Sequence, residues 1–258
     1  LIVTDYAGQM SDWEKIKNIS KKFKFFTIND NCHSLGSKYK NDQGYAVKFA
    51  DIVTHSFHPV KIITTGEGGC LSTNNFDIYK KALELRSHGV VRSDKLKKKY
   101  GNWFYSMVRL GYNYRMPDIN ASLGISQLKK IKKFISKRKS IAKDYFHGFR
   151  NNKNIILPFI ENFCDHSFHL FPIQIKFKNL KISKKTFFNK MLKHDINLQV
   201  HYIPVYLQKY YKEKFKFRKK MLPEAENFYS NAVSLPIYYS LDKKKVQKII
   251  KNINLLTQ

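Results

Sequence analysis

The first half of the chain alternates short apolar runs with segments of helical periodicity, and this alternation limits the fold more than any other feature. LIVT, KFFTIND, FADIVTHSF and GGCLSTN have the apolar and β-branched character of strands, whereas SDWEKIKNISKKF and FDIYKKALELRSHG have apolar residues at helical spacing. We expect Ser11, with Glu14 three residues later, to cap the first helix, and Gly89 to close the second. Strand–helix–strand alternation predicts an α/β fold with a mostly parallel sheet.

The second half has a different pattern. Residues 116–149 keep helical spacing over a long stretch with Pro117 near its start, which predicts one or two long helices. Shorter elements follow: HSFHLFPIQIKF as a strand, KKTFFNKMLKHD as a helix, INLQVHYIPVYL as a strand running into a loop, PEAENFYSNAVSL as a helix from Pro223, and DKKKVQKIIKNINLL as a final helix. We therefore predict two domains, one over residues 1–130 and a smaller α+β domain, preceded by a bridging helix, over residues 131–258.

The chain is strongly basic, with a formal net charge of +29 and a pI of about 9.9. The lysines are spread over its whole length instead of forming one stripe, so we do not expect nucleic acid as the main partner, although an anionic ligand would be attracted to this surface. Hydrophobic residues make up 43% of the chain, enough for a sizeable core. No apolar run is long enough to span a bilayer and the first residues do not resemble a signal peptide, so we expect no membrane association.

Cysteine and histidine are placed in ways that exclude several kinds of site. Cys32, Cys70 and Cys164 form no CxxC pair, and the nine histidines form no HExxH motif. We therefore expect no disulfide framework, no metal site and a reducing, cytoplasmic compartment.

Side chains that could carry chemistry gather between Asp30 and Gly69. Asp30 and Ser56 each lie where a predicted strand ends, and ligands of open α/β sheets bind at such ends. Lys61 follows Ser56 and lies among apolar neighbours. Desolvation of such a lysine would lower its pKa and favour the neutral amine that attacks a carbonyl. Taken singly, each residue has a plain structural interpretation, as a turn former, a strand-end hydroxyl or a solvated lysine. Their order and spacing together are far more specific.

The segments DNCHSLGSKY, FADIVTHSFHPVKIITTGEGGCLST, LELRSHG, LGYNYRMPDINASLGISQLKKI and VHYIPVY closely resemble those of the DegT/StrS sugar aminotransferases, which are pyridoxal-phosphate enzymes of fold type I. The resemblance extends over essentially all 258 residues. Its detail, including the histidine of DNCH, is most similar to the branch that aminates a UDP-linked 4-keto-6-deoxy amino sugar on the way to pseudaminic acid. It implies that residues 1–130 are the remainder of a cofactor-binding large domain.

The resemblance also implies roles for individual residues around pyridoxal 5'-phosphate. Lys61 would bind the cofactor covalently and move the proton during catalysis, and Asp30 would pair with the protonated pyridine nitrogen. His33 would lie beside the ring, and Ser56 would donate a hydrogen bond to the phosphate. Asn113 would reach the phosphate bound by a neighbouring subunit, since sites of this family lie at the interface of a homodimer.

Three further residues are assigned to the substrate by the same resemblance. Arg115 would lie near the subunit interface, and His201 and Tyr202 would face the substrate from the small domain. The neighbouring Tyr112 and Tyr114 are better explained by interface packing.

The implied reaction transfers an amino group, with glutamate as the expected donor, to a nucleotide-linked 4-keto-6-deoxy sugar in pseudaminic acid or related surface-glycan biosynthesis. An alternative is a basic, non-catalytic binding or regulatory protein derived from the same fold. A related dehydratase is a third possibility, but such enzymes replace the cofactor lysine by histidine, and Lys61 is present.

One departure from the family affects these expectations. Complete members begin much earlier and supply from that part a phosphate-binding loop, an aromatic ring stacked on the cofactor and several strands. We therefore expect this chain by itself to have weak activity or none unless the missing part is supplied elsewhere.

Overall fold

The computed structural model describes residues 1–218 and 220–258. The chain divides into two compact units. The first comprises residues 1–6, 10–132 and 163–165, and the second comprises residues 7–9, 133–162 and 166–258.

The first unit is built on a four-stranded sheet in the order β1-β2-β4-β5. Its strands are β1 (Ile2–Thr4), β2 (Ile28–Asp30), β4 (Ile52–Ser56) and β5 (Gly69–Ser72). β1, β2 and β4 run parallel, as the alternation in the sequence predicts, whereas β5 pairs antiparallel with β4. The register places Asp30 opposite Thr4 on one side and Thr54 on the other. The carboxyl ends of β2 and β4 therefore lie at the same edge of the sheet.

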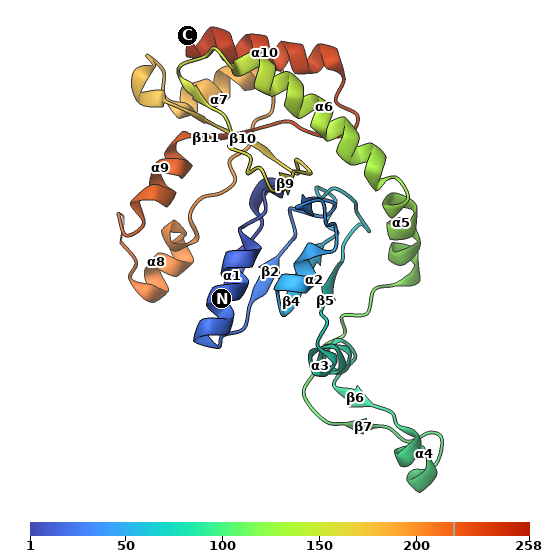
Figure 1. Cartoon of the computed structure of the whole chain (residues 1–258). Helices are drawn as coiled ribbons and strands as arrows, with labels where there is room; N and C mark the ends of the chain where they lie inside the picture. Colours follow the sequence, from blue (N-terminus) through green and yellow to red (C-terminus); the bar gives the residue numbers. More distant parts are fainter. Residues whose placement is uncertain (219) are drawn as a thin grey trace. The chain divides into compact units, whose positions relative to one another are not determined.

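One face of this sheet is covered by α1 (Trp13–Phe23) and α2 (Tyr45–Phe49), which also contact each other (Figure 1). α1 begins after Asp12, whose carboxylate accepts the N–H of Lys15. The expected Ser11 cap is therefore wrong by one residue, and the backbone N–H of Ser11 donates to the carboxylate of Asp5. The buried residues that form the core below these helices are Met10, Trp13, Tyr39, Tyr45, Ala46, Ala50 and Val53.

The remainder of the first unit is a helix, a hairpin and a further helix. α3 (Phe76–Arg86) ends near Gly89, which has a φ of 69° and donates its N–H to the carbonyl of Glu84. β6 (Val90–Val91) and β7 (Ser106–Met107) pair antiparallel and flank α4 (Asp94–Tyr100), and α5 (Asp118–Leu128) follows (Figure 1). β3 (Lys38–Tyr39) pairs with the distant β9 (Cys164–Asp165). A 3-10 turn, Tyr6–Gly8, follows β1, and its last two residues belong to the second unit.

The second unit packs helices against an antiparallel sheet in the order β11-β10-β8. Its strands are β8 (Ile155–Ile156), β10 (Phe171–Ile175) and β11 (Ala232–Leu235). Its helices are α6 (Ile131–Phe149, beginning in the first unit), α7 (Lys184–Lys193), α8 (Lys209–Phe215), α9 (Pro223–Asn231) and α10 (Lys243–Thr257), with 3-10 turns at Phe177–Asn179 and Val205–Leu207. Its core combines residues of α6, α7, α10 and the sheet.

Two sequence expectations in this unit are wrong. The segment INLQVHYIPVYL is not a strand: Gln199 makes a single bridge to Ser234, and Pro204, which lacks an N–H, leads into a 3-10 turn. The helix from Pro223 ends at Asn231, and residues 232–235 form β11 instead of continuing it. All four residues of β11 are buried, so the strand is selected by pairing with β10 and by burial on both faces.

Candidate active site

The carboxyl ends of β2 and β4 hold three of the residues singled out in the sequence. Asp30 is the last residue of β2, and its Oδ1 accepts the N–H of Cys32 at 3.2 Å. Ser56 is the last residue of β4, and its hydroxyl accepts the N–H of His58 at 3.4 Å. His33 is buried in the turn after β2, with its ring centroid 5.9 Å from that of Tyr6.

Lys61 lies in the turn after β4, where its N–H donates to the carbonyl of His58 at 2.9 Å. The next two residues, Ile62 and Ile63, are buried. Burial lowers the pKa of Lys61, and the nearby Cys32 thiol and Asp30 carboxyl partly oppose that change. Asp30 ends β2 and Lys61 lies in the turn after the neighbouring parallel strand β4, so both residues lie at the same edge of the sheet.

The glycine-rich turn after Lys61 connects it to β5. Gly68 has a φ of 152°, and a Cβ there would lie 2.5 Å from Oγ1 of Thr65, so a side chain at this position would clash. The carbonyl of Thr65 accepts a hydrogen bond from Nδ2 of Asn120, in α5, at 2.6 Å. Asn120 thus anchors the turn from a position 55 residues further along the chain.

A buried carboxylate below the site was also missed. Asp5 is fully buried, its N–H donates to the carbonyl of Asp30 at 3.1 Å, and its carbonyl accepts the hydroxyl of Ser34 at 2.9 Å. Its carboxylate accepts bonds from Ser11, Trp13, Asn29, Asn31 and Tyr45, at 2.7–3.2 Å. Burial raises the pKa of the Asp5 carboxyl, and these hydrogen bonds partly oppose the change. Asp5 therefore ties the turn that carries His33 to the helices below the sheet.

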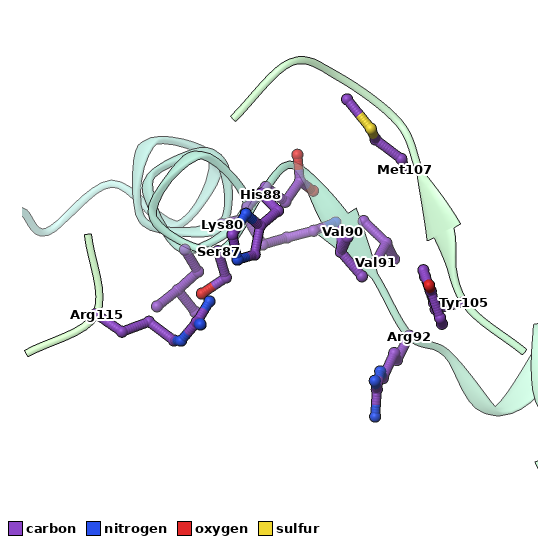
Figure 2. Close-up of a pocket in the computed structure, with 11 residues that line it drawn as sticks. Lys80, Ser87, His88, Val90, Val91, Arg92, Tyr105, Met107 and Arg115 are labelled. Atoms are coloured by element: carbon purple, nitrogen blue, oxygen red, sulfur yellow. The ribbon is translucent and has the colours of Figure 1, made fainter. Parts of the chain in front are cut away.

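Asn113 and Arg115 lie on the segment that follows β7, beside the end of α3. Asn113 forms a bridge with Ser87, and the N–H of Tyr114 donates to the carbonyl of Arg86 at 2.9 Å. Arg115 and Ser87 both line a groove, which is shown in Figure 2. The rings of Tyr112 and Tyr114 are stacked, with centroids 4.8 Å apart, and more than half of each side chain is exposed.

His201 and Tyr202 belong to the second unit. The imidazole Nδ1 of His201 lies 2.8 Å from the hydroxyl of Ser234 in β11, and the Tyr202 side chain is 55% exposed. Their assignment to the substrate stays a prediction.

The functional groups at the carboxyl ends of β2 and β4 are of the chemical types that can bind pyridoxal phosphate. A partly desolvated amine, Lys61, can bind an aldehyde, and a carboxylate, Asp30, can accept from a protonated ring nitrogen. The Ser56 hydroxyl, at the neighbouring strand end, can donate to a phosphate oxygen. Among the described residues, no group of three His, Cys, Asp or Glu side chains could hold a metal ion.

The family model for DegT/DnrJ/EryC1/StrS aminotransferases matches residues 1–254. The chain belongs to this family. A Campylobacter jejuni relative, UDP-4-amino-4,6-dideoxy-N-acetyl-beta-L-altrosamine transaminase, is 38% identical over 255 residues, which are 97% of this chain and 63% of the relative. The structure of Helicobacter pylori PseC, an aminotransferase involved in pseudoaminic acid biosynthesis, matches with a TM-score of 0.88 and 32% identity over 99% of this chain and 66% of PseC.

A putative sugar aminotransferase of Streptococcus pneumoniae, solved in a PLP form, has a TM-score of 0.87 and 27% identity over 99% of this chain and 67% of its own. These matches establish the fold-type I aminotransferase fold for the chain. The chain spans about two thirds of the length of these relatives. None of the helices in the described part of the chain has both the length and the apolar character needed to cross a bilayer.

Proposed function

We propose that the protein is a pyridoxal-phosphate-dependent aminotransferase. It converts a nucleotide-linked 4-keto-6-deoxy sugar to the 4-amino sugar, with glutamate as donor, in pseudaminic acid or related surface-glycan biosynthesis. The observation that carries the proposal is the placement of a partly desolvated Lys61 within electrostatic range of Asp30 at the end of a parallel sheet. The similarity to named transaminases of that pathway supports the choice of substrate.

Bound pyridoxal phosphate would supply an aldehyde that captures the amino group and a protonated ring that withdraws electrons from the reacting carbon. Lys61 would hold the aldehyde, and its Nζ, once released from the aldehyde carbon, would take up and return the proton of the reacting carbon. Its lowered pKa keeps part of the amine neutral, the form that can act as a base. Asp30 would accept a hydrogen bond from the ring nitrogen and thereby keep it protonated. Ser56 would donate to the phosphate, and buried His33 would limit the movement of the ring.

A homodimer would complete the site, with Asn113 of each subunit reaching the phosphate bound by its neighbour. The segment from residue 103 to residue 128 has an apolar surface suited to such an interface. Its exposed large apolar residues include Trp103, Leu110, Tyr114, Ile119 and Ile125. None of the three cysteines, all in the described part of the chain, forms a disulfide.

The deciding experiment is covalent labelling with stoichiometric pyridoxal phosphate followed by borohydride reduction and peptide mapping. We expect Lys61 to be labelled first, and Lys61→Ala to lose both the label and the absorbance band of the bound cofactor. Lys95→Ala, which removes an exposed lysine of α4, is the matched control and should behave as wild type. Because Asp30 raises the pKa of Lys61, Asp30→Asn should shift the labelling of Lys61 to lower pH.

Turnover is measured on the longest polypeptide that the gene encodes, with glutamate and a nucleotide-linked 4-keto sugar. If Lys61→Ala aminates the sugar at near wild-type rate, the proposal is wrong. Titration with duplex DNA tests the alternative, a basic binding protein: tight binding that falls steeply with salt, without labelling of Lys61, would favour it.

Subunit mixing tests the homodimer. A mixture of Lys61→Ala and Asn113→Ala proteins would contain hybrids with one site in which both residues are intact. Random exchange of equal amounts should then restore about a quarter of wild-type activity. No recovery, in a mixture shown to have exchanged subunits, would place Asn113 in the site of its own subunit.

A further inference from the structure

The turn that carries Lys61 is closed by a hydrogen bond between its first and last residues. The N–H of Lys61 donates to the carbonyl of His58 at 2.9 Å, so residues 58–61 form a β-turn. Pro59 occupies the second position of the turn, where the fixed φ of a proline favours this conformation. Because Lys61 ends the turn, the conformation of the turn determines the position from which the Lys61 side chain extends.

The imidazole of His58 holds the middle of this turn. Its Nδ1 accepts the backbone N–H of Val60 at 3.3 Å. Asparagine and aspartate commonly make this bond from the first position of a turn to the N–H two residues later, and a histidine makes it here. The His58 side chain is 48% exposed, so hydrogen bonds, more than close packing, orient the ring.

A carboxylate from the other end of the same loop faces the second ring nitrogen. Nε2 of His58 lies 3.8 Å from Oε1 of Glu67, in the glycine-rich turn before β5. Because Nδ1 accepts a hydrogen bond, neutral His58 carries its proton on Nε2, the atom that faces Glu67. Glu67 therefore favours the tautomer that can accept the N–H of Val60. The two ends of the loop are also joined by the N–H of Phe57 and the carbonyl of Gly68, at 2.8 Å.

The backbone of His58 contacts Ser56, the residue that holds the cofactor phosphate in the proposed function. The N–H of His58 donates to the Ser56 hydroxyl oxygen at 3.4 Å. This bond uses a lone pair of the oxygen and leaves the hydroxyl proton available for an acceptor such as a phosphate oxygen. His58 therefore bonds to both segments of the proposed cofactor site that follow β4, through its backbone to Ser56 and through its side chain to the turn of Lys61.

We propose that His58 is a positioning residue of the cofactor site: its imidazole, oriented by Glu67, holds the β-turn in the conformation from which the Lys61 amine reaches the cofactor aldehyde. The inference rests on the proposed function, because it requires Lys61 to be the residue that binds the aldehyde. A fixed turn keeps the amine in place relative to a ring held by Asp30, and such prior placement of reacting groups speeds their reaction. Without the bond to Val60 the turn samples more conformations, and fewer of them are productive.

Two measurements test the proposal on the longest polypeptide that the gene encodes. Hydrogen exchange at the Val60 amide, followed by NMR, reports on the turn without the cofactor. The rate at which stoichiometric pyridoxal phosphate forms a borohydride-reducible link to Lys61 reports on the placement of the amine. His58→Ala should speed the exchange and slow the labelling, each about two- to tenfold, the change expected for one net hydrogen bond.

Rescue by a conservative variant separates this role from a general structural one. His58→Asn should restore both rates, because its Oδ1 can accept the same N–H of Val60, whereas His58→Phe keeps a ring without an acceptor and should not. Glu67→Ala should slow the labelling less than His58→Ala does, and should have no further effect in the His58→Ala background, because Glu67 acts through His58. His147→Ala, which removes an exposed histidine of the second unit, is the control and should change neither rate.

Three results would overturn the proposal: an unchanged exchange rate at Val60 in His58→Ala, an unchanged labelling rate in that variant, or equal rates in His58→Phe and His58→Asn. If wild-type Lys61 is labelled and the His58 variants do not differ from it, the proposed function stands and only the role of His58 is wrong. If exchange at Val60 responds as expected but wild-type Lys61 is not labelled, His58 holds the turn and the proposed function is wrong.

Discussion

Replacement of Asp5 by alanine should destabilise the first unit strongly, although Asp5 has no role in the chemistry. Its carboxylate accepts hydrogen bonds from Nε1 of Trp13, from the side-chain amides of Asn29 and Asn31, and from the hydroxyl of Tyr45. Asp5, Trp13 and Asn29 have no exposed surface, and Asn31 and Tyr45 are 2% exposed. Water therefore cannot replace the carboxylate without opening the core.

The size of the effect follows from the donors left behind. Asn31 and Tyr45 also bond to each other at 2.6 Å, so three donor groups lose their acceptor for certain. An unpaired buried donor costs about 1–3 kcal/mol, which gives a loss of at least about 3 kcal/mol in the free energy of unfolding. Asp5→Asn should be almost as harmful. Oδ2 accepts four side-chain bonds and Oδ1 accepts those of Ser11 and Trp13, so an amide NH₂ in either place would face donors.

The chain contains two tryptophans, which makes the measurement selective. Trp13 is fully buried and bonded to Asp5, whereas the side chain of Trp103 is 77% exposed. In a Trp103→Phe background, urea unfolding followed by the shift of tryptophan emission therefore reports on the core around Asp5. The second unit contains no tryptophan and does not contribute.

Asp94→Ala is the matched control, because that side chain is 90% exposed and pairs only weakly with Lys97 at 3.5 Å. It should change the unfolding free energy by less than about 1 kcal/mol. A loss below about 1 kcal/mol for Asp5→Ala, or a stable Asp5→Asn variant, would refute the argument that this carboxylate organises the core.

Three further outcomes are expected. Burial lowers the pKa of His55 below its ordinary value of 6.5, and the charge of Asp30 partly opposes this shift. The stability that neutral His55 contributes is therefore present above pH 6.5 and is lost as the pH falls through the lowered pKa. His55→Gln should lose less stability than wild type between about pH 7.5 and 5.5 in the same urea assay. Arg138 donates from Nη1 to the carbonyls of residues 168, 169 and 237. Arg138→Met should lower the free energy of unfolding by about 3 kcal/mol, measured as faster hydrogen exchange in α6 and β10, and Arg138→Lys should restore part of the loss. A Cβ at Gly111 would lie 2.1 Å from the backbone nitrogen of residue 89, so Gly111→Ala should lower the free energy of unfolding by about 1–3 kcal/mol and raise hydrogen exchange in the β6–β7 hairpin. Gly44→Ala is the control and should have neither effect, because a Cβ there has its nearest neighbouring atom at 3.5 Å.

The residues of the candidate site differ in how far sequence could identify them. Asp30, Ser56 and Lys61 were found because strand ends are visible in hydrophobic patterning and because the segment around Lys61 is specific to the family. Asp5 and Asn120 were missed. Asp5 bonds to Asn29, Asn31 and Tyr45, which lie 24 to 40 residues away, and Asn120 bonds to Thr65, 55 residues away. Their functions depend on which distant groups the fold brings to them.

Sequence alone determined the parallel strands, the helices with strong periodicity, and the family, because these depend on residues a few positions apart or on a contiguous motif. Only the tertiary structure decided that residues 232–235 form a strand and that residues 38–39 pair with residues 164–165. It also decided that Arg138 bonds to a carbonyl 99 positions away. These features satisfy buried backbone and side-chain polar groups whose partners are far away in the chain, and local periodicity contains no information about them.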